Sequence, residues 1–305
     1  THDLLKVLNK QQETDDFSLR APQDPFTEAG VVASQYNNIM DKLEQSERQK
    51  NIWKSRVSKE IKLAIDVQKR LMPRRTINHF PIEGINIPAR EISGDFYDFY
   101  PHNDLIYFTL CDVSGKGVNA GMVMAKSITL FKIFSKLKFK PNEILLEMNN
   151  DLKDTNPTGT FVTSIVGCYN LKTDIVEIAN AGHQPALYRK EKDFREFPSE
   201  TTPLAIVKQT NSNVYKLESF KLDNGRIYCF TDGFSECLDE NNEELGINGV
   251  KKLILKHQNQ VLKKELDNAT EEIKQKSFKK DYLEKGIKDN NDILDDDLTI
   301  IGIGK

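Results

Sequence analysis

The 305-residue sequence lacks the features that mark several large classes of protein. It has no apolar run long enough to cross a bilayer, so we expect no membrane span within it. Its net charge is only −3, which leaves no electrostatic footprint for nucleic acid. It has four cysteines and no CxxC pair, so we expect reduced core cysteines in a cytoplasmic protein. With 38% hydrophobic residues, the chain can bury a full core and carry a smaller extension.

Aspartates beside glycines, or at the ends of apolar runs, are the informative feature that is present. Four such segments lie far apart along the chain, at residues 93–98, 111–115, 231–233 and 295–299. The apolar run 105–111 ends in Asp112, which places a carboxylate at the rim of a predicted sheet. The layout recurs at Asp232, and in reverse where Asp296 and Asp297 precede the run 298–303. If these segments converge, they form a metal site.

The chemistry of converging carboxylates indicates what such a site would hold. Two unit charges about 4 Å apart repel by roughly 4 kcal/mol at an effective dielectric constant near 20, so the cluster needs cations. Oxygen ligands without His or Cys favour Mg²⁺ or Mn²⁺ over zinc. Two such ions, roughly 3.5–4 Å apart, can bridge a hydroxide and clamp a phosphoryl group, which indicates phosphoester hydrolysis. Each segment taken alone is more typical of a turn in which Asp and Gly serve backbone geometry, and only the four together favour a metal site.

Five blocks of sequence, in order, resemble the metal-dependent, type 2C-like (PPM) protein serine/threonine phosphatases. The likeness is strongest to their RsbU-like branch and extends from about residue 60 to the C-terminus. The blocks are Glu-Ile-Ser-Gly-Asp-Phe-Tyr-Asp (91–98), Asp-Val-Ser-Gly-Lys-Gly (112–117), Asn-Ala-Gly-His-Gln-Pro (180–185), Thr-Asp-Gly-Phe-Ser-Glu (231–236) and Asp-Asp-Leu-Thr (296–299).

The resemblance implies which residues hold two or more Mn²⁺ or Mg²⁺ ions. The implied metal-binding groups are Asp95, Asp112, the backbone carbonyl of Val113, Asp232 and Asp296. Asp95 and Asp112 would be the catalytic pair that bridges or ligates the ions. Asp297 is the alternative to Asp296, because the sequence does not say which carboxylate points inward. Asp98 is expected to support the ligands from behind.

Three further positions, which are not predicted metal ligands, have expected roles of their own. Arg90, five residues before Asp95, lies where eukaryotic relatives have a phosphate-binding arginine, although it also suits a solvated surface position. His183 is expected to be a turn or packing residue, because a hydroxide held by two metals needs no imidazole. Ala205 replaces the glycine that commonly follows Pro-Leu in this family, so a different turn conformation is expected there.

The resemblance implies an α+β fold, a four-layer αββα sandwich of two antiparallel sheets flanked by helices. The apolar runs agree with it, because few predicted strands are joined by single crossover helices. Strands are predicted at 105–111, 161–169, 175–179, 215–222, 226–231 and 298–303, and helices at 118–136, 142–153 and 249–285. The Lys- and Glu-rich span 251–292 is expected to be a charged helical flap over the site or a disordered insertion.

The N-terminal part is expected to be a signalling extension. Residues 4–43 resemble a HAMP module, so residues 1–46 are assigned to it, 47–75 to a linker helix and 76–305 to the phosphatase domain. HAMP modules usually follow a membrane span, which implies an upstream sensor and a membrane-anchored protein whose cytoplasmic portion this is. A heptad seam from Tyr36 through Met40 and Leu43 to Leu71, polar in its middle, predicts a parallel homodimer. The alternative is an amphipathic helix packed on its own domain.

Together these observations predict a protein phosphatase that acts on phosphoserine or phosphothreonine. In this branch the substrate is typically a phosphorylated anti-sigma-factor antagonist, and the dimeric helix would regulate assembly of the metal site. Two alternatives stay open: a binuclear hydrolase of small phosphoesters, and a non-catalytic signalling relay.

Overall fold

The computed structural model describes residues 2–14, 16–22, 26–73, 80–156, 159–238, 243–285, 294 and 296–304. The chain divides into two compact units, residues 1–63 and 64–305, which are considered separately. None of the helices in these described ranges is both long enough and apolar enough to cross a membrane.

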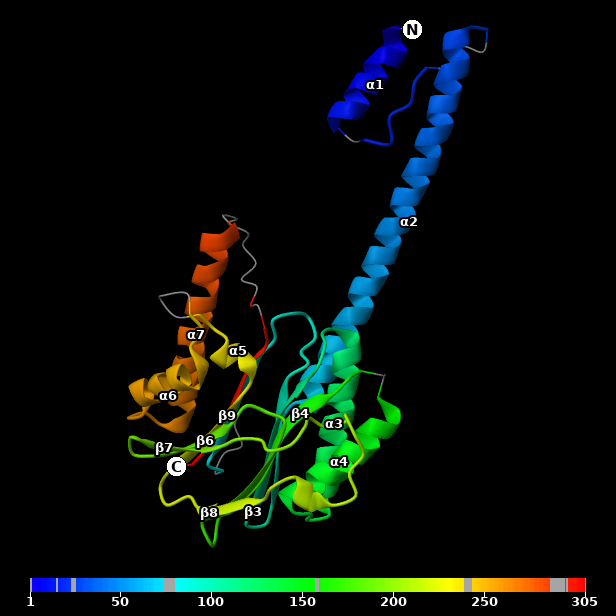
Figure 1. Ribbon diagram of the computed structural model, residues 1–305. Helices are drawn as coiled ribbons and strands as arrows, with labels where there is room; N and C mark the ends of the chain where they lie inside the picture. The colour runs from blue at the N-terminus through cyan, green and yellow to red at the C-terminus, as the bar shows by residue number, and fades with distance from the viewer. Residues whose placement is uncertain are drawn as a thin grey trace. The chain divides into compact units, whose positions relative to one another are not determined.

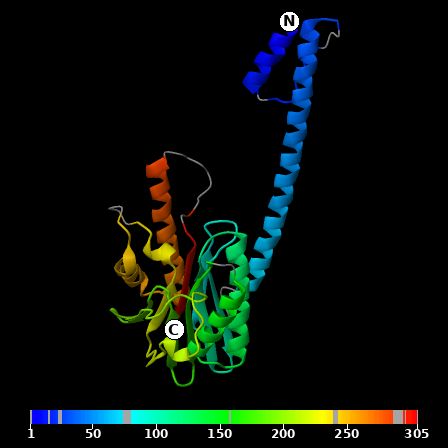
Figure 2. The same cartoon turned by 45° about the vertical axis from the view of Figure 1, so that its right-hand side comes forward.

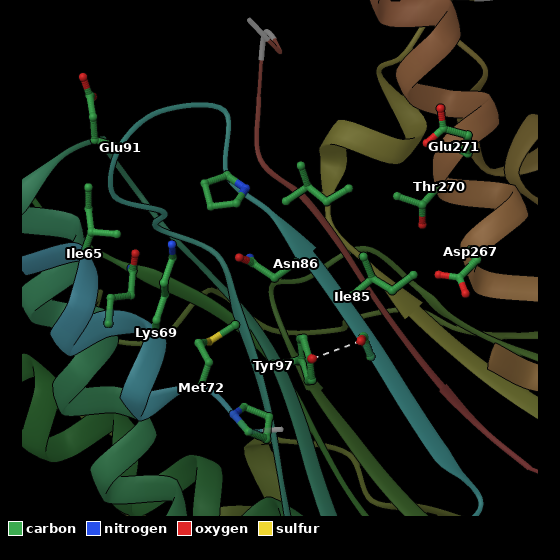
Figure 3. A pocket seen from close by; sticks show the side chains of 15 residues that line it. Ile65, Lys69, Met72, Ile85, Asn86, Glu91, Tyr97, Asp267, Thr270 and Glu271 are labelled. Carbon is green, nitrogen blue, oxygen red and sulfur yellow. Dashed lines mark hydrogen bonds between the residues drawn. The ribbon is translucent and has the colours of Figure 1, made fainter. Parts of the chain in front are cut away.

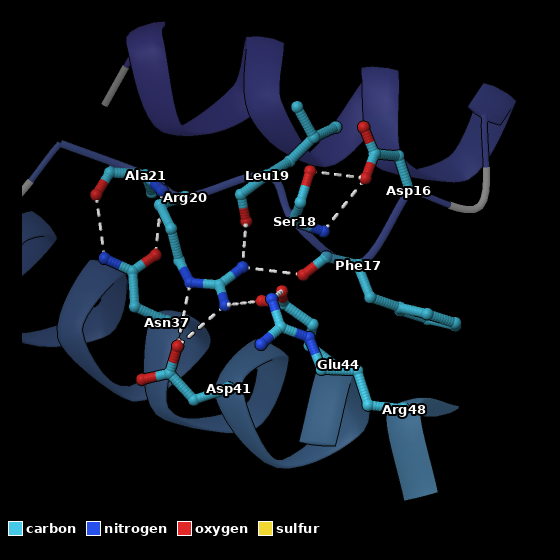
Figure 4. Close-up of polar contacts among 10 residues, drawn as sticks. All are labelled: Asp16, Phe17, Ser18, Leu19, Arg20, Ala21, Asn37, Asp41, Glu44 and Arg48. Atoms are coloured by element: carbon cyan, nitrogen blue, oxygen red, sulfur yellow. Dashed lines mark hydrogen bonds and ion pairs between the residues drawn. The ribbon is translucent and has the colours of Figure 1, made fainter. Parts of the chain in front are cut away.

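The N-terminal unit is two helices joined by an extended connector (Figure 4). Helix α1 (His2–Thr14) is followed by the connector at 16–22 and by α2 (Glu28–Leu71), which continues past residue 63. The Asn37 amide exchanges two hydrogen bonds with the backbone of Ala21, at 2.8 and 2.9 Å. The Arg20 guanidinium pairs with Asp41 and Glu44, each at 2.7 Å. These contacts hold the connector against α2.

The C-terminal unit contains two five-stranded sheets whose paired strands are all antiparallel. Sheet A has the order β1 (Ile82–Ile87), β10 (Leu298–Ile303), β9 (Arg226–Phe230), β6 (Ala186–Lys190) and β7 (Asp193–Phe197). Sheet B has the order β2 (Phe96–His102), β3 (Leu105–Val113), β4 (Val162–Asn170), β5 (Ile175–Ala181) and β8 (Glu218–Lys221).

Helices cover the outer face of each sheet, which gives four layers (Figures 1 and 2). On sheet B lie α3 (Val118–Lys136) and α4 (Pro141–Thr155); on sheet A lie α6 (Gly246–His257) and α7 (Leu262–Lys285). The short helices α5 (Asp232–Ser235) and η1 (Ser212–Val214) complete the unit. The predicted α+β sandwich of two antiparallel sheets flanked by helices is therefore confirmed.

Alternating side chains divide the core of this unit into three clusters. In β3, Ile106 and Phe108 pack between the two sheets, whereas Tyr107 and Cys111 pack under α3 and α4. This period of two is what a strand buried on both faces requires. All four cysteines are buried and free of disulfides, as expected.

The charged span after residue 250 differs from the expectation. Buried Leu253, Leu262, Leu266 and Ile273 fix α6 and α7 on sheet A, so this part is a packed layer and neither a flap nor an insertion. The predicted helix 249–285 is two helices that break between His257 and Leu262. Residues 286–292 lie outside the described residues.

The turn at Ala205 keeps a left-handed backbone, with φ 68°. An L residue other than glycine or asparagine pays roughly 1–2 kcal/mol for this conformation. The backbone N–H of Ala205 donates to Asn149 Oδ1 at 3.0 Å, and the neighbouring Leu204 pairs with Val162. These contacts hold the turn in a left-handed conformation that glycine adopts readily and that strains alanine.

Candidate metal centre

Strands β2 and β3 bring the first two predicted ligands side by side. Phe96 pairs with Cys111 in the register, so Asp95 and Asp112 lie at the next pair of positions along the sheet. Asp112 lies an even number of residues from Ile106 and Phe108, which face sheet A, so its carboxylate comes from the same inner face of sheet B. Gly94 allows this approach, because a Cβ there would lie 2.9 Å from the Val113 carbonyl oxygen.

Strands β9 and β10 supply the other carboxylates from sheet A. The Thr231 N–H donates to the Thr299 carbonyl at 3.0 Å, which aligns the end of β9 with the start of β10. Asp232 begins α5 directly after this point, and Asp296 and Asp297 directly precede β10. Asp295, the first residue of the acidic run, lies outside the described residues.

A small cavity of about 20 Å³ lies where these segments meet. This volume is sufficient for one water molecule or an ion. Its lining includes five of the predicted metal-binding residues and the predicted phosphate-binding arginine: Asp95, Asp112, Val113, Asp296, Asp297 and Arg90. Asp232 does not line it, although its charge acts on both Asp95 and Asp112.

The pKa shifts of the carboxylates show that they lie close together with too little positive charge. Burial raises the pKa of Asp95 well above its usual value, and the charge of Asp112 raises it further. Burial raises the pKa of Asp112 to about 6, with the charge of Asp232 as the next cause. Burial and the charge of Asp296 raise the pKa of Asp232. A bound cation would reverse these shifts, because an opposite charge favours the ionised form.

Asp297 binds protein donors on both of its oxygens. Its Oδ1 accepts from the Ala89 N–H at 2.7 Å. Its Oδ2 accepts from the Ser93 hydroxyl at 2.6 Å and from the Gly94 N–H at 3.0 Å. A carboxylate saturated in this way holds the loop 89–95 in place and has little capacity left for an ion.

Asp296, in contrast to Asp297, is partly exposed to solvent. Its side chain is 39% exposed, and its Oδ1 lies 3.3 Å from the Lys116 ammonium. It acts electrostatically on both Asp112 and Asp232. These contacts favour Asp296 over Asp297 as the acidic ligand supplied by the start of β10.

The residues present suit a pair of divalent ions that keep part of their water better than ions enclosed entirely by protein ligands. Within the described ranges, no three His, Cys, Asp or Glu side chains converge on one point. Mg²⁺ usually keeps several waters and is held by only one or two carboxylates, so it does not need such a cage. Asp95 is 3% exposed, and its Oδ2 has no hydrogen-bond partner. A cation would bind beside this buried carboxylate oxygen, because the oxygen has no hydrogen-bond partner and three other carboxylates lie close to it.

Asp98 does not support the site as expected. It alternates with Tyr97 on β2 and therefore faces α3, where the Lys132 ammonium lies 3.0 Å from its Oδ2. His183 is a packing residue, as predicted. Its ring connects the Thr163 hydroxyl, at 2.6 Å from Nδ1, with the Phe230 carbonyl, at 3.1 Å from Nε2. Burial lowers the pKa of His183 to about 4, so the ring is neutral.

Two side-chain amides that hold the backbone beside the carboxylates were not predicted from the sequence. Asn86 Nδ2 donates to the Asp95 carbonyl at 3.2 Å and to the Thr299 hydroxyl at 2.8 Å, which fixes the backbone of one ligand to sheet A. Gln68, near the end of α2, exchanges two hydrogen bonds with the backbone of Ser93, at 2.7 and 3.2 Å. No motif marks Asn86, whereas Gln68 lies in the predicted linker helix.

A larger groove of about 450 Å³ adjoins these amides but is not the site of the carboxylates (Figure 3). Its floor is β1, with Ile85 and Asn86. One wall is the end of α2, with Lys69 and Met72, and the opposite wall is α7, with Glu271. Because Glu91 also lines the groove, the groove borders the loop that carries Asp95.

Comparison with known proteins gives relatives for this arrangement. Residues 102–304 match the family model of Stage II sporulation protein E (SpoIIE). Two curated relatives come from Bacillus subtilis. The phosphoserine phosphatase RsbU is 26% identical over 187 residues, 61% of this chain and 56% of RsbU. The phosphoserine phosphatase RsbP is 22% identical over 192 residues, 59% of this chain and 46% of RsbP. The chain thus spans about half the length of these relatives.

The fold is also that of solved phosphatase structures. The SiaA-PP2C domain of Pseudomonas aeruginosa has a TM-score of 0.69 at 15% identity, covering 83% of this chain and 98% of that one. The RsbU and RsbW domains of Rv1364c from Mycobacterium tuberculosis give 0.60 at 19% identity, covering 74% of this chain and 60% of that one. These likenesses show the fold, and the family match shows descent. The chain belongs to the SpoIIE family, with a PP2C-type phosphatase domain of the RsbU-like kind predicted from its motifs.

Proposed function

We propose that this protein is a metal-dependent phosphatase of phosphoserine or phosphothreonine on a regulatory protein. The observation that carries the proposal is the group of carboxylates with raised pKa values around the orphaned Oδ2 of Asp95. The names of RsbU and RsbP as phosphoserine phosphatases support it. In this function Asp95, Asp112, Asp232, Asp296 and the Val113 carbonyl hold two or more ions, and Asp297 orders the loop beside them.

The chemistry divides between the ions and the chain. Mn²⁺ or Mg²⁺, when bound, supplies Lewis acidity and a water of lowered pKa. Among similar folds, RsbX has been crystallised with magnesium. The chain supplies carboxylates that neutralise the ions and a loop clamped by Asp297. Arg90 lines the same cavity and is a candidate contact for the phosphate.

The shape of the site favours a protein substrate over a small phosphoester. A small phosphoester hydrolase needs a pocket that encloses its ligand, and such pockets typically measure about 300–1,000 Å³. The cavity at the carboxylates measures about 20 Å³, so a phosphate has to approach from a larger surface. An anti-sigma-factor antagonist, the substrate typical of the RsbU-like branch, is a carrier of that kind.

Metal removal tests this function. Treatment with EDTA should lower hydrolysis of a phosphorylated anti-sigma-factor antagonist at least about 100-fold, and added Mn²⁺ should restore it, because the ions supply the activated water. Phosphate release should be measured for this phosphoprotein and for free phosphoserine with the same enzyme preparation. Similar kcat/KM values for the two would identify a small-phosphoester hydrolase. Failure to bind Mn²⁺ at millimolar concentration would instead identify a non-catalytic relay.

We further propose that residues 1–46 are a HAMP-like module and that 47–75 link it to a phosphatase domain at 76–305. The helix, connector and helix of the N-terminal unit support this, since the connector is bound to α2 through Asn37 and Arg20. In this arrangement the chain is the cytoplasmic portion of a membrane-anchored protein. Gln68 is the proposed transmission contact, because it joins α2 to the backbone beside Asp95.

The proposed homodimer uses a face of α2 that overlaps the predicted seam and extends to one side of it. Met40 is buried within the single chain and Gln68 binds Ser93, so both are already engaged. Exposed apolar residues recur at multiples of seven on the adjacent face: Val32, Ile39, Trp53 and Val67. Together with Leu43 and Val57 they form a heptad stripe that a second copy can cover. Ser46 and Lys50 interrupt the stripe and keep the pairing weak, as a switch between two packings requires.

Two leucine pairs test this dimer. Ser46→Leu with Lys50→Leu adds apolar surface to the stripe and should tighten self-association at least about tenfold. Ser55→Leu with Lys62→Leu adds the same surface to the far face and is the matched control. Sedimentation equilibrium gives the association constant, and phosphatase activity should change only in the first pair. Equal association by both pairs would refute the stripe, and unchanged activity in a tightened dimer would refute regulation through it.

A further inference from the structure

Lys116 is a cation within the carboxylate cluster that no step of the proposed function uses. Its ammonium lies 3.3 Å from Asp296, it lowers the pKa of Asp232, and it lines the same cavity as Asp95 and Asp112. Its side chain is 42% exposed, so solvent and substrate can reach it. Arg90 also lines the cavity, but no ion pair joins it to a described carboxylate.

The backbone around Lys116 is suited to an anion. Gly115 and Gly117 flank it with φ of 92° and 83°, and a Cβ at either position would meet nothing within 4 Å. Gly117 is the N-cap of α3, a helix of 19 residues with no side-chain cap and no acidic residue in its first turn. The first N–H groups of α3 and its dipole therefore favour negative charge there.

A second observation indicates which anion this is. Asp95, which is only 3% exposed and whose Oδ2 has no hydrogen-bond partner, lines the cavity that Lys116 also lines. A divalent ion held there would keep coordination positions filled by water, and a phosphoryl group of the substrate could replace one of these waters. Such a group would lie between the ion and the cationic end of α3.

We propose that Lys116, with the first turn of α3, positions the phosphoryl group of the substrate. Its ammonium pairs with Asp296; if an ion were held by that carboxylate, Lys116 would weaken this pairing and contact the phosphate. This inference rests on the proposed phosphatase function and adds the residue that recognises the transferred group. Lys116 thereby competes with the metal in the absence of substrate and assists it in the presence of substrate.

Lys116→Met separates these two effects. Calorimetric titration of the metal-free variant should show Mn²⁺ binding about two- to fivefold tighter, because a neighbouring positive charge has gone. With Mn²⁺ bound, orthophosphate should bind about tenfold more weakly, because a charge-assisted hydrogen bond is lost. KM for an aryl phosphate should rise about as much, with kcat changed less than threefold, and Lys116→Arg should recover phosphate binding.

Lys126→Met is the matched control. Lys126 lies on the same helix, pairs with Asp151 at 2.5 Å and does not line the cavity. It should leave both affinities within twofold of the parent. The inference is overturned if Lys116→Met leaves phosphate affinity unchanged, or if it weakens Mn²⁺ binding. If the parent itself shows no Mn²⁺-dependent hydrolysis, the proposed function fails as well, so the two failures are distinguished by the parent alone.

Discussion

Replacing Asp112 with Asn should lower kcat for aryl phosphate hydrolysis in Mn²⁺ by at least about 10³-fold, because a carboxylate proposed to hold the ions is lost. The change is nearly isosteric, and it removes one charge from a cluster in which burial raises the pKa of Asp112 to about 6. The metal-free variant should therefore be at least as stable as the parent at pH 7. Activity and thermal unfolding, measured on the same preparation, separate loss of chemistry from loss of fold.

The neighbouring pair Asp296 and Asp297 sharpens this test. Asp296→Asn should match the loss seen at Asp112 and weaken Mn²⁺ binding. Asp297→Asn should cost only about 10- to 100-fold, since Asp297 orders the loop 89–95 and we propose Asp296 as the ligand of the ion. A reversed order of the two variants would assign the ligand to Asp297. Full activity in Asp112→Asn would rule out the proposed centre.

Replacing Glu265 with Ala should destabilise the protein by about 3–5 kcal/mol, which makes it the largest expected effect on folding. Glu265 on α7 is fully buried and accepts from the Tyr228 hydroxyl at 2.8 Å. It also pairs with Arg189, at 3.4 Å, and with Arg226. Its removal leaves the buried guanidinium of Arg189 and the partly buried guanidinium of Arg226 without their shared carboxylate. The melting temperature should fall by about 10 °C for a domain of this size.

Glu218→Ala is the control for Glu265→Ala. Glu218 also pairs with an arginine of sheet A, Arg195, at 2.9 Å, but both side chains are solvent-accessible. Exposed pairs contribute about 0–1 kcal/mol, so this variant should melt close to the parent. Replacing Glu265, Arg189 and Arg226 together by Leu, Met and Met should recover much of the loss, because no buried charge then remains unpaired. Equal melting temperatures for Glu265→Ala and Glu218→Ala would contradict the role of the buried cluster.

The position of the acidic cluster was predictable because strands alternate and turns are short. An apolar run that ends in Asp112, with a register that pairs Phe96 with Cys111, leaves few places for the carboxylates. The boundaries of α3 were predicted to the residue, from Val118 to Lys136. Strands β1, β2, β6 and β7 were missed, because they are short and carry no alternation that separates them from their surroundings.

Which of Asp296 and Asp297 orders the loop 89–95, and which is left as the proposed ligand, could not be predicted from the sequence. Both are aspartates before the same strand, and only the donors of Ala89, Ser93 and Gly94 distinguish them. The same holds for Asp98, whose face of β2 depends on a register that the motif does not contain. Along α2, the heptad pattern was visible, but the use of Met40 and Gln68 within the chain depends on tertiary contacts.

The hydrogen bonds between Asp297 and the loop 89–95 have a consequence for folding during synthesis. Its carboxylate orders Asp95, which lies 202 positions earlier in the chain. During translation, the loop that carries Asp95 leaves the ribosome long before Asp297 exists, and β1 waits equally long for β10. A nascent chain therefore cannot assemble the centre, and the proposed phosphatase activity can start only once β10 has been synthesised.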